Sequence, residues 1–389
     1  MWSRGVALLS AAVLALAQDG MVRREGGQWV QVQTGMIPIP PKGRLRVETR
    51  GPVAVQGQSQ TADRIQYALR KRVRARTEAE ARALLNAATF RSSTQDGQTT
   101  IAIPRVRQAV STEMELTTPN GLQQVNIDTV GGDVQVYDIR GTVHAQSGGG
   151  LIQMDRIASD VFARTGGGEV RLGTIGGSIR CYSGGGSIQV DRAGAESWLE
   201  TAGGDIFVRE SRGPVHTTTA GGNIEVQRAS AMVSARTAGG RIEVLQAGGV
   251  VLADNAGGSI QVGSAGGVRV ASAGGSIRLR GSSGSLRAVT DVGSILAEFL
   301  SGSGLQDSIL STGSGDITVY IPSNLPLTIK ALNENGRASR IISEFSEILV
   351  RQAAEAARHG VSAEGTINGG GPVLRLTSTG GTIYLKRQR

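Results

Sequence analysis

The stretch GGNIEVQRASAMVSARTAGGRIEVLQAGG, residues 221–249, carries the pattern that decides the fold. Gly-Gly pairs recur at one constant spacing, at positions 131, 149, 167, 185, 203, 221, 239 and 257. Further pairs at 176, 248, 266 and 274 fall on or next to the half-period, so the unit has nine residues, G-G-x-[IV]-x-[VL]-x-x-[AT]. Residues 122–300 divide into twenty units, of which one, 266–273, has eight residues. A short fixed period over so long a span is typical of a solenoid.

The apolar positions of the unit indicate which kind of solenoid it is. They alternate, as in Ile224 and Val226 or Ile242 and Val244, which places them on one face of a short strand. Gly-Gly then turns the chain, since glycine adopts positive φ and lets backbones approach closely. Two strands and two turns make one coil, and stacked coils pair in parallel. We therefore predict an all-β fold, a parallel β-helix or β-solenoid of about ten 18-residue coils, each of two nine-residue half-coils.

The composition argues against several classes of site. One cysteine and three histidines leave too few ligands for a Cys/His metal centre, a disulfide framework or a Cys–His catalytic pair. Cys181 takes an inward position of its unit and is predicted to be a small buried hydrophobe. Calcium-binding β-rolls share the nine-residue glycine spacing, but here the inward positions are apolar and offer no oxygen ligands. We expect no metal and no cofactor.

The first residues predict export. Arg4 precedes an apolar run from Val6 to Ala17, and Ala15-Leu16-Ala17 is a cleavage signal before Gln18. Residues 1–17 are therefore interpreted as a secretory signal peptide, with a buried N-terminal helix as the alternative. No later run approaches the ~18 apolar residues of a membrane-spanning helix. We expect a periplasmic, cell-surface or extracellular protein without a membrane span after cleavage.

The segments that flank the repeat are predicted to close its two ends. Residues 18–121 contain expected strands at 44–48, 53–55 and 64–76, another beginning at Ile101, and a helix over 77–88 capped by Thr77 and Glu80. Residues 301–389 contain one more unit at 315–322, strands at 325–332, 373–376 and 381–385, and a predicted helix at 343–358. Such segments cover the open edges of a solenoid, which otherwise invite aggregation.

The repeat resembles the bacterial "putative adhesin" family of unknown function. The resemblance rests on the units at 122–300, on the motif GSGDITVYIP at 313–322 and on GGTIYL at 380–385. It covers about two-thirds of the chain and implies a β-solenoid attached to a cell surface. It implies no established ligand and no catalytic residue.

The charge distribution suggests a polyanionic partner. The formal net charge is +9, and residues 61–110 hold ten basic and four acidic side chains. Basic patches attract polyanions at long range. For an exported chain we expect an anionic cell-surface glycan or an envelope protein, and not nucleic acid. A merely solvated basic face is the alternative, and the sequence leaves the oligomeric state open.

Two columns of outward side chains are candidate sites. On one face the same position of successive coils is occupied by His144, Phe162, Arg180, Trp198 and His216. Stacked exposed rings with an arginine between them bind sugar rings or a partner chain, unless a flanking segment covers them. On the other face Glu225 and Glu243 lie on adjacent coils, as glycan hydrolysis requires of a carboxylate pair. Nearby Arg241 offers a plain ion pair instead.

These observations favour a non-enzymatic exported β-solenoid, an adhesin-like surface or periplasmic scaffold or binding module. A glycan-active parallel β-helix enzyme, a lyase or hydrolase, is the first alternative and needs a carboxylate pair in a groove. A filament that assembles through end-to-end strand pairing is the second, and needs uncovered ends.

Overall fold

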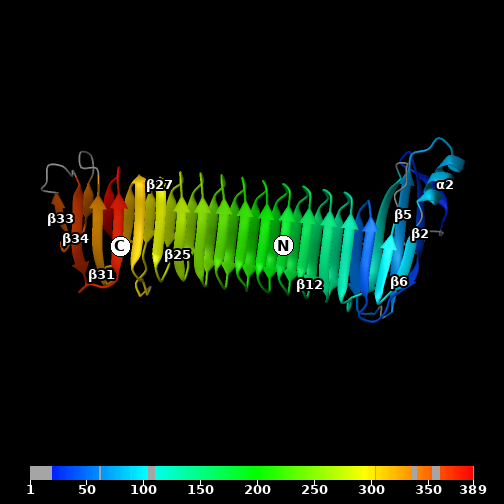
Figure 1. Cartoon of the computed structure of the whole chain (residues 1–389), viewed down its shortest axis with the longest axis horizontal. Coiled ribbons are helices and arrows are strands. Elements are labelled where there is room, and N and C mark those ends of the chain that lie inside the picture. Colours follow the sequence, from blue (N-terminus) through cyan, green and yellow to red (C-terminus); the bar gives the residue numbers. More distant parts are fainter. Residues whose placement is uncertain are drawn as a thin grey trace. The chain divides into compact units, whose positions relative to one another are not determined.

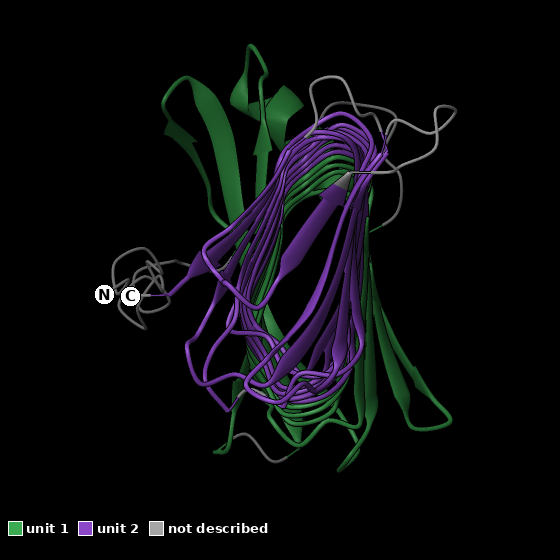
Figure 2. Cartoon of the chain, turned by 90° about the vertical axis from the view of Figure 1, so that its left-hand side faces the viewer, with its two compact units in different colours: residues 1–177 green, residues 178–389 purple. Residues whose placement is uncertain are grey.

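The computed structural model describes residues 20–60, 63–88, 90–103, 110–302, 304–334, 340–352 and 360–388. The predicted signal peptide, 1–17, lies outside the described residues. The chain forms two compact units, residues 1–177 and 178–389 (Figure 2). The described residues are all-β apart from one short helix, and their strands form a parallel β-solenoid of about 11 turns. The predicted fold class is confirmed.

In unit 1 the repeat has the predicted register. Strands of one sheet pair with an offset of one whole coil, as in Val134 with Ile152 and Ile152 with Val170. The strands are β9 (Gln124–Thr129), β10 (Val134–Ile139), β11 (Thr142–Ser147), β12 (Ile152–Ile157), β13 (Val161–Thr165) and β14 (Val170–Ile175). Successive strands alternate between two sheets, so each coil contributes one strand to each.

The coil before the repeat is built out of sequence order. Strand β3 (Arg44–Thr49) lies between β9 and β7 (Gln98–Ala102), parallel to both. Strand β4 (Val53–Gln58) likewise lies between β10 and β8 (Ser111–Pro119). The strands predicted at 44–48 and 53–55 thus form the turn that pairs directly with the repeat. The strand expected to begin at Ile101 instead begins at Gln98 and ends at Ala102.

Antiparallel strands and the helix complete unit 1 (Figure 1). Strand β5 (Arg64–Val73) pairs with β8 and with β2 (Gln28–Pro38), which pairs with β1 (Val22–Glu25), while β6 (Arg91–Gln95) pairs with β7. Helix α2 (Glu78–Ala87) begins after Thr77, whose side chain accepts a hydrogen bond from the Glu80 amide, as predicted. Its buried Ala81 and Leu85 pack with Val22 and Val73.

Unit 2 continues the same architecture, with its strands superposed one behind another in Figure 2. One sheet, here called sheet A, contains β16 (Ile188–Ala193), β18 (Ile206–Ser211), β20 (Ile224–Ala229), β22 (Ile242–Ala247), β24 (Ile260–Ser264), β26 (Ile277–Arg280), β28 (Ile295–Glu298), β30 (Ile317–Ile321), β36 (Ile383–Arg387) and β32 (Ile341–Ser343). The other, sheet B, contains β15 (Ile179–Ser183), β17 (Ser197–Thr201), β19 (Val215–Thr219), β21 (Val233–Thr237), β23 (Val250–Asn255), β25 (Gly267–Ser272), β27 (Leu286–Val292), β29 (Ser308–Ser314), β35 (Val373–Ser378), β31 (Leu327–Asn333), β34 (Val361–Ile367) and β33 (Leu349–Gln352). In unit 1 the same names apply: β10, β12 and β14 belong to sheet A, and β9, β11 and β13 to sheet B.

Departures from the one-coil offset mark insertions and deletions in unit 2. Ile260 pairs with Ile277, one residue short, because the unit at 266–273 has eight residues. The strands β29 and β30 pair next with β35 and β36, where Ser308 faces Leu374 and Ile317 faces Ile383. The final strands therefore form the turn next to 308–321. The strands β31 and β32, which precede them in the sequence, pair with the other edges of β35 and β36.

The helix predicted at 343–358 is wrong for its described part. Residues 341–343 and 349–352 are the strands β32 and β33, and residues 353–359 lie outside the described residues. Ser343 Oγ accepts a hydrogen bond from the Phe345 amide, which favours a turn over a helix. Phe345 and Ile348 are buried, and Leu349–Gln352 pairs with β34. Burial and strand pairing override helix propensity here.

The core is narrow and mostly apolar along its centre, with Ser197 and Thr217 as buried polar side chains on β17 and β19. Ile224 and Val226 on one side and Val233 and Ala235 on the other are all at most 1% exposed. Cys181 is completely buried, as predicted, and burial raises the pKa of its thiol. The thiol therefore stays protonated and serves as a packing residue.

The turn glycines are required because the backbones of neighbouring coils approach closely. The sequence argument also expected positive φ at these glycines, and that part is wrong. Positive φ occurs at other glycines, such as Gly281 and Gly284, but at none of the regularly spaced pairs from 131 to 258. A Cβ on Gly222 would lie 2.0 Å from the carbonyl oxygen of Gly204, whereas one on Gly221 would meet nothing within 4 Å. Thr219 closes the same turn, because its hydroxyl donates to Gly204 O at 2.9 Å and accepts from Gly222 N at 3.2 Å.

Candidate functional site: the outer face of sheet B

In unit 1 the predicted stripe begins with His144 on β11 and Phe162 on β13. The two residues are direct register partners, and their ring centroids lie 5.8 Å apart at an interplanar angle of 53°. His144 is exposed and Phe162 is half-buried. The alternating inward and outward positions of the strands therefore place these rings on the outer face, as the sequence predicts.

In unit 2 the stripe continues with Arg180, Trp198 and His216 on adjacent strands of sheet B. Trp198 is 46% exposed, although its ring lies parallel to that of His216 with centroids 3.9 Å apart and an interplanar angle of 11°. The carboxylate of Glu196 fixes the imidazole ring of His216, because His216 Nε2 lies 3.2 Å from Glu196 Oε1.

This stacking limits what the stripe can bind. Rings that stack along the direction of strand pairing turn their faces toward each other and their edges toward solvent. A sugar ring that stacks on an aromatic side chain needs an open face, and one face of Trp198 is covered by His216. The stacked pair of Trp198 and His216 is therefore first a cross-strand contact that stabilises the sheet, and only one face of the Trp198 ring is left to stack on a sugar.

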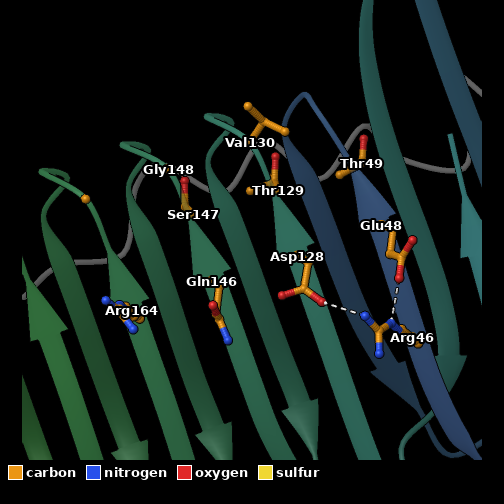
Figure 3. A pocket seen from close by; sticks show the side chains of 11 residues that line it. Arg46, Glu48, Thr49, Asp128, Thr129, Val130, Gln146, Ser147, Gly148 and Arg164 are labelled. Atoms are coloured by element: carbon orange, nitrogen blue, oxygen red, sulfur yellow. Dashed lines mark hydrogen bonds and ion pairs between the residues drawn. The ribbon is translucent and has the colours of Figure 1, made fainter. Parts of the chain in front are cut away.

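A hollow of about 610 Å³ lies on the same outer face in unit 1 (Figure 3). Arg46 stands at one side of it, with its Nε 2.7 Å from Glu48 Oε1 and a terminal nitrogen 3.6 Å from Asp128 Oδ2. Gln146 and Arg164 follow on the next strands and face the same space (Figure 3). Strand pairing explains the grouping, because Glu48, Asp128, Gln146 and Arg164 are successive register partners.

A second hollow of about 330 Å³ adjoins the first and contains the predicted stripe residue His144. Both hollows share Arg46, Asp128 and Gln146, and the second adds two amide side chains, Gln124 and Asn126. Gln124 Nε2 donates to Asn126 Oδ1 at 3.0 Å, so these amides are already oriented. Together the hollows present hydrogen-bond donors and acceptors over a polar, open surface.

Sequence reasoning found His144 but missed Arg46, Asp128 and Gln146. Asp128 and Gln146 lie two residues beyond the stripe position on their own strands, so the repeat register could have found them. Arg46 lies on β3, a strand outside the repeat, and its position depends on the out-of-order pairing of β3 with β9. No periodicity in the sequence indicates that pairing.

The carboxylates proposed for an enzyme are adjacent but engaged. Glu225 and Glu243 are direct partners on β20 and β22 and are half-buried. Glu243 forms an ion pair with Arg241 at 2.6 Å, and Glu225 Oε1 accepts from Gln227 at 3.2 Å. The ion pair that the sequence offered as a plain explanation thus holds Glu243, and Gln227, which the sequence analysis did not name, holds Glu225.

A cluster of charged groups with shifted pKa values lies elsewhere, on sheet A of unit 1. Arg156 makes two hydrogen bonds to Asp138, at 2.6 and 2.7 Å, and one to Asp155 at 2.5 Å. These contacts lower the pKa of Asp138, chiefly through the Arg156 hydrogen bond, and raise the pKa of Arg156 for the same reason. Asp138 and Arg156 both adopt positive φ, and the pairing of β10 with β12 skips this one residue on each strand, so the cluster joins the two strands where their ladder is interrupted.

Much of the basic segment 61–110 is neutralised within unit 1. Arg70 pairs with Glu25 at 2.5 Å and Arg72 with Glu113 at 3.0 Å, and shorter-range pairs hold Arg64 and Arg82. Lys71 is only 4% exposed and donates to the Leu85 carbonyl at 3.3 Å, and burial lowers the pKa of its ammonium group. Arg105 and Arg107 lie outside the described residues.

Metal ions and membranes have no evident place in the described residues. Among them no group of three or more His, Cys, Asp or Glu side chains is arranged to hold a metal ion. Nor does that part of the chain contain a helix long and apolar enough to cross a membrane.

Similarity to known proteins is found among solved structures and not among family models or curated proteins. No protein-family model and no curated protein matches the chain. Three solved structures that match it are all described as adhesins or cell-adhesion proteins of bacteria. Their names agree with the family that the repeat motifs resemble.

The alignments themselves are long but loose. A "putative cell adhesion protein" from Clostridium sporogenes covers 92% of this chain and 100% of its own, at 10% identity and a TM-score of 0.20. A "putative adhesin" from Bacteroides fragilis covers 92% and 97%, at 13% identity and a TM-score of 0.23. Another from Parabacteroides distasonis covers 91% and 97%, at 10% identity and a TM-score of 0.27.

Proposed function

We propose that this protein is a non-enzymatic, exported, adhesin-like binding module that recognises an extended cell-surface glycan on the outer face of sheet B. The observation that carries the proposal is the pair of polar hollows around Arg46, Asp128 and Gln146 in unit 1. Sugar hydroxyls both donate and accept hydrogen bonds, and these hollows combine carboxylates, amides and guanidinium groups. A site for an apolar small molecule would instead be enclosed and lined by hydrophobic side chains.

The shape of the surface supports a polymer over a single sugar. The hollows are open and extend across β3, β9, β11 and β13, so a ligand crosses several strands. Contacts of this kind are individually weak, and an adhesin gains strength by making many of them. The predicted signal peptide supports the export that such a role requires.

A glycan-array screen of the full exported chain tests the proposal, with Gln146→Ala as the site variant and Trp198→Ala as its comparison. Gln146 lines both hollows, and we expect its loss to weaken binding roughly fivefold, as the removal of one net hydrogen bond does. Trp198→Ala removes a stacked ring in unit 2 and should retain glycan binding. The proposal fails if the wild type binds no glycan, or if Gln146→Ala binds as tightly as the wild type.

A further inference from the structure

Sheet B of unit 2 carries a column of four exposed cations, Arg269, Arg287, Arg375 and Lys330, here called the basic column. Arg269 and Arg287 are direct register partners on β25 and β27. Ile309 on β29 separates Arg287 from Arg375 on β35, and Arg375 is in turn the direct partner of Lys330 on β31. Residues from positions 269 to 375 are thus gathered in one line across five strands.

The fold gains nothing from this arrangement. Like charges directly opposite each other on neighbouring strands are destabilising. Within the described residues no carboxylate lies within 4.0 Å of any of the four cations. Some other arginines of unit 2 are compensated across strands, as Arg236 is by Asp254 at 3.2 Å and Arg280 by Glu298 at 3.4 Å. Lys330 faces Glu364 across β31 and β34, but none of the three arginines has an acidic register partner. Their mutual repulsion is a cost to stability, and a ligand of opposite charge would offset it.

The surface beside the basic column is small and neutral. Two residues further along each strand, the outward side chains are Ala271, Val289, Ser311 and Thr377, again in direct register. These four residues form a neutral track. A linear ligand that lies along the track meets no acidic group there, while the ligand's own anionic groups reach the basic column. Glu364 lies in register with Lys330 on β34, so the acid-free track ends there.

We propose that the basic column binds a linear acidic polysaccharide that runs across the strands of unit 2. Neighbouring strands lie about 4.8 Å apart, so Arg269 and Arg287 form one close pair and Arg375 stands about 10 Å beyond Arg287. Arginine suits the role, because its planar fork holds a carboxylate or sulfate through two hydrogen bonds.

The side chains of the column favour a polysaccharide over other polyanions. Single-stranded nucleic acid is bound by cations interleaved with aromatic platforms, and neither the basic column nor its neutral neighbour contains an aromatic residue. An anionic membrane surface is bound by cations beside large apolar side chains that enter the lipid. The neighbouring track has the small residues Ala271, Ser311 and Thr377. Its apolar side chains are Val289, which is half-buried, and Leu332, which is exposed at the β31 end, and these two are too few to anchor the face in lipid.

The test measures binding of the full chain to immobilised heparin and polygalacturonate at two salt concentrations. The site variant is Arg269→Gln/Arg287→Gln, and Arg375→Gln/Lys330→Gln is a second site variant. The control is Arg228→Gln/Arg278→Gln, which removes the same charge from exposed positions on sheet A. All four proteins are compared by thermal melting, so that a folding defect is recognised.

We expect the wild type to bind at least one of the two polymers, and more weakly at higher salt. Each site variant should lose roughly fivefold to thirtyfold in affinity, the effect of two exposed charge pairs, while the control retains wild-type affinity. Equal losses in site and control variants would overturn the proposal, because they would show a non-specific charge effect. Tighter binding to single-stranded DNA or to phosphatidylglycerol vesicles through the same residues would also overturn it.

These outcomes are separate from those of the glycan array. Gln146→Ala alters the hollows of unit 1 and leaves the basic column intact, so it should not change binding to the acidic polymers. Failure of the basic column thus leaves the proposed glycan-binding role standing, and failure of the array result leaves the basic column standing.

Discussion

The sharpest prediction concerns the two glycines of a single turn, Gly221 and Gly222. An alanine Cβ at position 222 would lie 2.0 Å from Gly204 O, 2.4 Å from Gly204 C and 2.8 Å from Asp205 N. All three atoms belong to the backbone of the adjacent coil, so no side-chain rotation relieves the clash. At position 221 the same methyl group meets nothing within 4 Å, and the φ angle is not positive.

The expected cost follows from the distance that the coils must yield. Ordinary contact begins near 3.4 Å, so the two turns must separate by roughly 1.4 Å at this point. That movement breaks the hydrogen bond from the Thr219 hydroxyl to Gly204 O, at 2.9 Å, and stretches the bond from Ile206 N to Asn223 O, now 2.8 Å. We expect Gly222→Ala to destabilise unit 2 by about 3 kcal/mol. Gly221→Ala should instead be neutral or stabilise by about 0.5 kcal/mol, because it restricts the unfolded chain.

Solenoids open locally, so the assay must report on this turn as well as on the whole chain. Urea denaturation followed by circular dichroism measures the global effect. Limited trypsin digestion with mass spectrometry measures the local one, through cleavage after exposed Arg228 and Arg236 on the neighbouring strands. The reasoning is refuted if the two alanine variants have equal midpoints, or if Gly221→Ala opens the turn as readily as Gly222→Ala.

Three further predictions test other parts of the structure. Cys181 should resist alkylation in the native protein and react only on unfolding, because it is fully buried and burial raises the pKa of its thiol; rapid native labelling would contradict this. Asp138→Asn should cost about 1 kcal/mol at neutral pH, since the Arg156 contact lowers the pKa of Asp138. This difference in the free energy of unfolding is fully present above the pKa of Asp138 in the unfolded chain, near 3.8, and disappears as the pH falls through its lower pKa in the folded chain. Acid-denaturation curves of the wild type and the variant measure it. Sedimentation velocity tests the filament alternative. The outer strand β33 exposes Leu349 and Val350, but end-to-end pairing would also need the outer strand β6, which is polar and fully exposed and resists edge pairing. We therefore expect no concentration-dependent assembly, and growing polymers would reverse this view.

Periodicity predicted the strands well, because it reflects a constraint that acts at every coil. The one-coil offset between paired strands, the inward Ile and Val positions and the buried Cys181 all follow from it. The same logic placed His144 and Trp198 on an outer face. It did not reveal that the ring of Trp198 is stacked on that of His216, since ring orientation depends on side-chain rotation and not on register.

Prediction failed where the chain leaves the period. The segment 343–358 has the composition of a helix, yet its described part forms strands because Phe345 and Ile348 are buried and β34 offers a partner. Strand β3 lies between two strands that are distant in sequence, and with it Arg46 enters the candidate site. Local propensity contains no information about either long-range contact.

The two kinds of basic charge in this chain show why a count along the sequence misidentifies a binding surface. The window 61–110 holds ten basic side chains, but β5 pairs with β2 and β8, and the carboxylates near those strands neutralise Arg70 and Arg72. The basic column arises from residues up to a hundred positions apart, none of them in a charged run. It exists because the chain returns after residue 372 to pair β35 with β29. A polyanion binds charges that are near in space and lack partners. We therefore expect substitutions in the basic column to weaken polyanion binding more than removal of the same charge at Arg70 and Arg72 does.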